Sequence, residues 1–177
     1  SDGNVRRQTF YGRGELVRET DGSRLTISAR SDYTREGGME TGKNHYGSLK
    51  LDVMMWGDLY AYGLVSAEYD RFAGIDLRTI ISAGLGYRVL RTQSHEVDFE
   101  AGGAYTNEDY RRGDDVNFAS LRFAGRWRWS LTESIRLRSL IEFYPNLENF
   151  DDFLVYGESF LLMEIFENVD IEAGVIW

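Results

Sequence analysis

The sequence predicts an all-β fold, an antiparallel up-and-down transmembrane β-barrel of about ten strands, and three observations lead to it. Apolar and polar residues alternate strictly over segments about as long as a tilted membrane-spanning strand. The composition of 11 Tyr, 10 Phe, 4 Trp and 19 Gly against a single Pro favours strands over helices. No window approaches the roughly 18 apolar residues that a spanning helix requires. The chain of 177 residues is expected to form one domain, 1–177.

Charge and mean hydropathy exclude several other classes of protein. The net charge is −9 and the mean hydropathy is −0.40. A spanning strand turns only alternate side chains to lipid, so a low average is compatible with a barrel. The acidic balance argues against a nucleic-acid partner. The absence of Cys excludes disulfides and thiolate metal sites. If the protein is exported, we expect its signal peptide to have been removed from this sequence.

The ten predicted strands follow from this alternation. The first four are expected at residues 5–18, 24–34, 44–55 and 59–71. Residues 77–89 carry Leu77, Ile81, Leu85 and Val89 on one parity and Arg78 and Arg88 on the other. Residues 95–107 carry Val97, Phe99 and Tyr105 against Glu96, Asp98 and Glu100. Residues 116–130 carry Leu121, Phe123, Trp127 and Trp129 against Arg122, Arg126 and Arg128. Residues 135–145 carry Leu137, Ile141 and Phe143 against Arg136, Arg138 and Glu142. Strands at 153–165 and 169–177 complete the set, and the apolar parity is expected to face lipid.

Short and long connections alternate between these strands. The short ones are 20–23, 56–58, 91–94, 132–134 and 166–168, whereas 35–43, 107–115 and 146–152 are longer and more charged. This asymmetry is typical of outer-membrane barrels, which have short periplasmic turns and longer extracellular loops. Both ends of the chain then fall on the long-loop side. We therefore expect twelve strands in the intact protein, or ten if residues 5–18 pair with 169–177.

The polar parity predicts ladders of opposite charge across a narrow lumen. Its members are Arg78, Arg88, Glu96, Asp98, Glu100, Arg122, Arg126, Arg128, Arg136, Arg138 and Glu142. Hairpin register is expected to place Arg88 opposite Glu96, and Arg126 or Arg128 near Asp98 and Glu96. Arg136 and Arg138 should then lie beside Arg128 and Arg126. These four arginines would form a basic stripe, which needs further carboxylates to balance its charge. The candidates are Glu142, Glu158, Glu164, Asp170 and Glu172. Paired side chains of this length would constrict the pore.

Aromatic residues near the strand ends predict two girdles at the membrane interfaces. At the short-turn end these are Trp56, Tyr60, Tyr87, Trp127 and Trp129. At the long-loop end they include Tyr69, Tyr105 and Phe143. The alternative explanation is β-propensity, which also enriches aromatic residues in strands.

Candidate catalytic and cofactor-binding residues are few. His45 and His95 fall at opposite ends of the predicted barrel, and no Ser/His/Asp triad can be assembled. Gly84-Leu85-Gly86 lacks the third glycine and the following helix of a dinucleotide site. The glycines 84, 86, 102, 103 and 125 are expected to give neighbouring side chains room. We expect no enzymatic activity, no metal site and no cofactor.

Two segments resemble a known family. Ala67–Asp76 contains Tyr69-Asp70-Arg71-Phe72-Ala73-Gly74, and Ser82–Arg88 ends in Gly84-Leu85-Gly86-Tyr87-Arg88. With Val97–Tyr105 they resemble the domain-of-unknown-function family described as salt-induced outer-membrane proteins. The likeness covers roughly residues 45–177 and departs at Gly103, where the family pattern has Pro. The resemblance implies an outer-membrane barrel and brings no substrate or catalytic residue.

These features predict an integral, porin-like barrel of the Gram-negative outer membrane, with a structural or small-solute and ion channel role. Its expected partners are outer-membrane lipid and lipopolysaccharide. One alternative is a lipid-modifying enzyme, which would need a Ser beside His45 at the outer rim. Another is a soluble ligand-binding β-barrel, in which the apolar parity would face inward.

Overall fold

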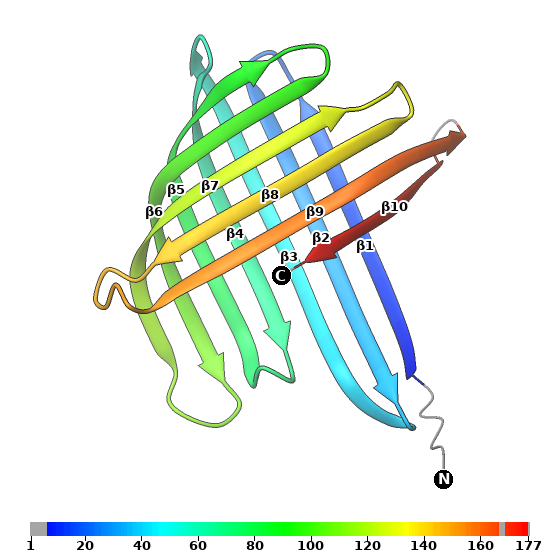
Figure 1. The fold of residues 1–177 in the computed structure, drawn as a ribbon. Helices are drawn as coiled ribbons and strands as arrows, with labels where there is room; N and C mark the ends of the chain where they lie inside the picture. The colour runs from blue at the N-terminus through cyan, green and yellow to red at the C-terminus, as the bar shows by residue number, and fades with distance from the viewer. Residues whose placement is uncertain (1–6, 167–168, 177) are drawn as a thin grey trace. The chain divides into compact units, whose positions relative to one another are not determined.

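The computed structural model describes residues 7–166 and 169–176, which form ten strands in a single antiparallel sheet (Figure 1). The strands are β1 (Arg7–Glu19), β2 (Ser23–Glu36), β3 (Met39–Trp56), β4 (Leu59–Asp70), β5 (Ile75–Arg91), β6 (His95–Tyr110), β7 (Val116–Ser130), β8 (Ile135–Pro145), β9 (Phe153–Phe166) and β10 (Val169–Ile176). Each neighbours the next in chain order, which confirms the predicted all-β up-and-down fold. Among the described residues, no helix is long and apolar enough to span a membrane.

The hairpins are tighter than the sequence predicts at two of the expected long loops. Pairing of β2 with β3 continues to Glu36↔Met39, so the expected loop over residues 35–43 is a turn of Gly37 and Gly38. Their φ angles are 59° and 86°, the left-handed region in which glycine is unstrained and which two-residue hairpins require. β6 likewise continues to Tyr110, so the second loop shortens to residues 111–115. The charged residues at these strand ends predict loop because alternation of polarity stops there.

By their contacts, the residues group into two compact units that cut across the strands. The first unit comprises residues 1–53, 63–82 and 105–118, and the second comprises residues 54–62, 83–104 and 119–177. The first unit therefore holds the turns after β2, β4 and β6, and the second holds those after β3, β5 and β7. The single domain 1–177 stays a prediction.

On these strands many apolar side chains are exposed and many charged ones are buried, which is the reverse of a soluble protein. Among the apolar residues expected to face lipid, Ile81, Leu85, Phe99, Leu121, Phe123 and Ile141 are exposed. Val97 and Leu137 are half-buried. The buried side chains on the alternate parity include Ser82, Asp98, Glu100, Ser120, Arg122 and Glu142. Because water-soluble folds bury apolar rather than charged side chains, this pattern is typical of a sheet whose apolar face meets lipid.

Candidate functional site

A buried ionic network centred on Arg122 crosses the charged face of the second unit. Arg122 is only 1% exposed. Its guanidinium donates to Glu100 Oε2 at 2.7 Å and to Glu142, and its Nε also donates to the Tyr144 hydroxyl at 3.1 Å. The ring of Tyr62 lies 4.8 Å from the guanidinium carbon. Four strands, β4, β6, β7 and β8, are thus cross-linked through one arginine, whose charge is matched by two carboxylates.

Glycines make room for the tyrosines of this network. Tyr60 donates a hydrogen bond to Glu100 Oε1 at 2.8 Å. A Cβ at Gly86 would overlap the Tyr60 ring. A Cβ at Gly102 would come within 2.5 Å of the Tyr62 hydroxyl and 2.8 Å of the Gly84 Cα. Close approach of side chains and backbone therefore requires glycine here, which confirms the structural reading of these glycines, whereas Gly103 faces open space.

The ladder continues from the Arg122 network toward the turn between β5 and β6. Arg126 lies 3.9 Å from Asp98 and 4.0 Å from Glu100. Arg128 pairs with Glu96 and lies 3.9 Å from Asp98. Asp98 and Glu96 are the carboxylates that the sequence placed near the two arginines, whereas the approach of Glu100 to Arg126 was not predicted. Arg88 is half-buried on β5, and its pairing with Glu96 stays a prediction.

The register of β7 with β8 differs from the predicted one by two residues. Arg128 faces Arg138 and Ser130 faces Arg136, whereas Arg136 was expected beside Arg128. The prediction was wrong because alternation of polarity is unchanged by a shift of two residues, and the observed partners are those symmetric about Glu133 in the turn 131–134. Of the extra carboxylates, Glu164 lies 4.0 Å from Arg136. The side chain of Asp170 lies outside the described residues.

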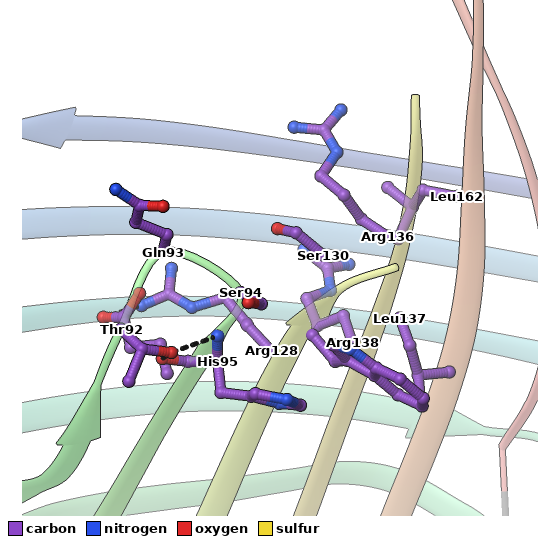
Figure 2. Close-up of a pocket in the computed structure, with 12 residues that line it drawn as sticks. Thr92, Gln93, Ser94, His95, Arg128, Ser130, Arg136, Leu137, Arg138 and Leu162 are labelled. Atoms are coloured by element: carbon purple, nitrogen blue, oxygen red, sulfur yellow. Dashed lines mark hydrogen bonds and ion pairs between the residues drawn. The ribbon is translucent and has the colours of Figure 1, made fainter. Parts of the chain in front are cut away.

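The arginines on β7 and β8 line a hollow at this end of the second unit (Figure 2). Its volume is about 340 Å³. The lining residues come from the turn after β5 and from β6, β7, β8 and β9, and they are Thr92, Gln93, Ser94, His95, Glu96, Arg128, Trp129, Ser130, Arg136, Leu137, Arg138 and Leu162. Three of them are arginines and one is a carboxylate, so the hollow is basic.

A second charge cluster lies in the first unit, around Arg78. Arg78 Nε donates to Glu108 Oε1 at 2.6 Å, and its Nη1 donates to Glu68 Oε2 at 3.1 Å. The Tyr110 hydroxyl donates to the other oxygen of Glu108. Sequence analysis placed Arg78 in the ladder but missed both carboxylates. Glu108 was assigned to a loop, although its parity matches that of Asp98 and Glu100.

The turn after β4 is organised by Asp70. Its Oδ1 accepts the backbone N–H groups of Phe72 at 2.9 Å and Ala73 at 3.0 Å, and its Oδ2 accepts Asn44 Nδ2 at 3.1 Å. Burial by itself would raise the pKa of Asp70, but these hydrogen bonds outweigh it and hold the pKa below its ordinary value. The ionised carboxylate therefore stabilises this turn.

The predicted girdle residues divide by exposure. Those exposed are Trp56, Tyr87, Tyr105, Trp127 and Phe143, whereas Tyr69 and Trp129 are half-buried. Tyr60 is a correction, since it is 2% exposed and lies on the charged face with Glu100. Its position near a turn favoured a place in the girdle. Its parity, which it shares with Tyr62, instead places it on the charged face, opposite the apolar one.

One pairing that sequence analysis missed joins Ser31 and His45. The two residues are direct partners across β2 and β3, and Ser31 Oγ lies 2.9 Å from His45 Nδ1. Counting outward from Gly37-Gly38 would place Ser31 opposite Asn44, and the register shift between Thr34 and Arg35 moves it opposite His45, so no signal in the sequence marks this contact. At the other histidine, the His95 ring stacks against Trp129 at 5.4 Å and Trp127 at 6.2 Å.

Comparison with known proteins places the chain in a family. The family model "Protein of unknown function, DUF481" matches residues 1–177. The chain belongs to the DUF481 family. This member is also similar to a solved structure of the NanC porin, with a TM-score of 0.58 and 9% sequence identity. That match covers 95% of this chain and 82% of the porin chain. No curated protein sequence matches this DUF481 chain. At such low identity the likeness shows the fold alone, that of a porin β-barrel.

Proposed function

We propose that this DUF481 protein is an integral β-barrel of the bacterial outer membrane, with a narrow charged lumen and a structural or small-solute and ion channel role. The observation that carries the proposal is that the strands expose their apolar side chains and bury their charged ones. Phe99 is 57% exposed, whereas its neighbours Asp98 and Glu100 are buried among arginines. A soluble ligand-binding barrel would show the opposite parity, with Phe99 buried and the carboxylates in water.

The charged lumen is supported by how the arginines are held. Arg122 is fully enclosed by its partners, while Arg126 and Arg128 reach toward carboxylates on β6. Side chains that pair in this way fill space which a wide pore would leave to water. We therefore expect a low conductance from the wild-type protein.

Two measurements test the proposal. The purified chain should need detergent to stay monomeric, and it should fractionate with the outer membrane. In planar bilayers, Arg126→Ala combined with Arg138→Ala should raise the conductance, whereas Arg91→Ala, an exposed residue at the end of β5, should not. A monodisperse protein in plain buffer, or a large ohmic conductance from the wild type, would contradict the proposal.

Lipopolysaccharide is the partner that a cluster around Tyr69 favours. The Lys43 ammonium lies 5.9 Å from the Tyr69 ring and the Arg111 guanidinium 6.0 Å, and His45 stacks on the same ring. Cations beside an interfacial aromatic ring suit the phosphates of a lipid headgroup. Lys43→Gln with Arg111→Gln should reduce the lipopolysaccharide that copurifies with the protein. Equal copurification would exclude this contact.

A second candidate function, lipid hydrolysis, is favoured only by the Ser31–His45 contact. A hydrolase needs a serine beside a histidine, and it also needs a group to orient the ring. Asp32, the carboxylate next to Ser31 in the sequence, could be such a group, but it forms an ion pair with Arg30 at 3.2 Å. We therefore propose that the protein is not an enzyme and expect no phospholipid hydrolysis above background. Hydrolysis that disappears in both Ser31→Ala and His45→Ala would establish the second candidate.

A further inference from the structure

Lys43 and His45 lie where the apolar face of β3 ends. Leu49, Leu51 and Val53 are exposed at alternate positions of this strand. Lys43 and His45 continue the same parity toward the turn after β2, so they share the face of the apolar residues. In the proposed orientation that face meets lipid, and polar side chains just beyond an apolar band lie at the level of the lipid headgroups.

The ring of Tyr69 brings these two side chains together with a guanidinium. The His45 ring stacks on Tyr69 with the ring centroids 5.9 Å apart and the planes inclined by 23°. The Lys43 ammonium lies 5.9 Å from the Tyr69 ring, and the Arg111 guanidinium lies 6.0 Å from it. Arg111 Nη2 donates to the Tyr69 hydroxyl at 3.1 Å and to Asp76 Oδ1 at 2.6 Å, which fixes the guanidinium beside the ring. Lys43, His45 and Arg111 therefore contact one ring at the end of the apolar face.

The contact with Ser31 determines which nitrogen of His45 can serve a ligand. Ser31 Oγ lies 2.9 Å from His45 Nδ1, and both residues are exposed. A protonated imidazole carries an N–H on each nitrogen, so Nδ1 can donate to the serine while Nε2 donates to an anion. Stacking on Tyr69 holds the plane of the ring. Protonation of His45 thus adds a third cation, with a directed donor, to the lysine and the arginine.

The other charged groups near this histidine are engaged elsewhere. Asp32 on β2 pairs with Arg30 at 3.2 Å, and Glu40 on β3 pairs with Arg71 at 3.1 Å. Asp70 on β4 accepts backbone hydrogen bonds of the turn that follows it. Both aspartates are one residue away in sequence from a residue that contacts the histidine, so they point to the opposite face of their strands. The charge gained by the histidine therefore adds to that of the two neighbouring cations.

The turns at this end of the strands favour lipopolysaccharide over a phospholipid as the source of the anion. The turns after β4 and β6 comprise residues 71–74 and 111–115. They are longer than the turns after β3 and β5, which comprise residues 57–58 and 92–94. Longer connections mark the outer side of an outer-membrane barrel. The lipid phosphates of the outer leaflet are those of lipopolysaccharide.

We propose that Lys43, His45 and Arg111 together bind a phosphate group of lipopolysaccharide, and that His45 binds it in the protonated form. The inference rests on the proposed function, which has lipopolysaccharide as a partner, and deepens it by adding a third ligand and a dependence on pH. Histidine is the side chain whose charge ordinarily changes between about pH 5 and about pH 8, so binding should strengthen as the pH falls through that range.

The test uses purified lipopolysaccharide as the probe and the full chain in micelles of a neutral detergent, with binding measured by thermophoresis. The wild type should bind about fivefold more tightly at about pH 5.5 than at about pH 8, the gain expected from one exposed charge-assisted hydrogen bond. His45→Gln should abolish this gain and keep the affinity at the higher pH. His45→Lys, which is charged at both pH values, should bind tightly at both. His95→Gln removes the only other histidine of the sequence and should leave the gain intact.

Further arms separate this inference from the proposed partner. If Lys43→Gln with Arg111→Gln weakens binding at the higher pH but His45→Gln keeps the pH dependence, lipopolysaccharide remains a partner and the role of His45 is overturned. If neither variant changes binding, the partner and the inference both fail. Dephosphorylated lipopolysaccharide should lose the pH-dependent gain, and an unchanged gain would overturn the phosphate assignment. Equal affinity for phosphatidylglycerol added to the same micelles would overturn the assignment to lipopolysaccharide.

Discussion

Arg122 is predicted to be the side chain whose loss destabilises the protein most. Arg122→Met retains much of the side-chain volume but removes the cation that hydrogen-bonds both Glu100 and Glu142. Breaking a buried ion pair by removing one partner typically costs about 3–5 kcal/mol, because the other charge stays buried. We expect the free energy of unfolding to fall by about that amount.

The assay is reversible urea unfolding of the protein from lipid vesicles, followed by tryptophan fluorescence. Arg91→Met serves as a control, since an exposed arginine should change the free energy by less than about 0.5 kcal/mol. The triple variant Glu100→Gln, Arg122→Met, Glu142→Gln removes all three charges of this network together. It should therefore recover most of the stability lost in the single variant.

Two results would refute this reasoning. A loss below about 1 kcal/mol in Arg122→Met would mean that water solvates the carboxylates, as in a wide pore. A triple variant as unstable as the single one would mean that packing of the guanidinium, rather than charge, stabilises the strands.

Three further predictions concern a glycine, a turn and the lipid-facing surface. Gly102→Ala should destabilise the fold by about 1–3 kcal/mol through overlap, whereas Gly103→Ala should be neutral by comparison, as judged by the heat-modifiable fraction on gels. Because the pKa of Asp70 is lowered, its stabilisation is present above the ordinary value of 3.8 and is lost as the pH falls below it. Asp70→Asn should therefore lower the unfolding midpoint at neutral pH, and the difference should vanish in strong acid. Phe99→Arg should reduce stability in vesicles by about 2–4 kcal/mol, and Leu77→Arg, on the same face near the start of β5, by about 0–1 kcal/mol. Equal costs at the last two positions would contradict the membrane orientation.

The parity of each strand was predictable from sequence because it is a local property. Side chains alternate along any extended chain, so the faces of β5, β6 and β7 follow from which residues are apolar. Strand number and chain-order pairing followed as well, since tight turns permit only neighbouring antiparallel strands. Tyr60 was assigned to the aromatic girdle from its position near a turn, and that assignment was wrong because its parity places it on the charged face.

Contacts between strands depended on the tertiary structure, because a shift of two residues keeps the parity and changes every partner. The register of β7 with β8 placed Arg138 rather than Arg136 opposite Arg128, and the register shift between Thr34 and Arg35 placed Ser31 opposite His45 rather than Asn44. The same registers decided that Arg122, one of several equivalent arginines in the sequence, is enclosed by Glu100 and Glu142. Sequence alone determined which face carries the charges, and only the register of the folded sheet decided which of them meet, since pairing energies are set by separations of a few ångströms between atoms on different strands.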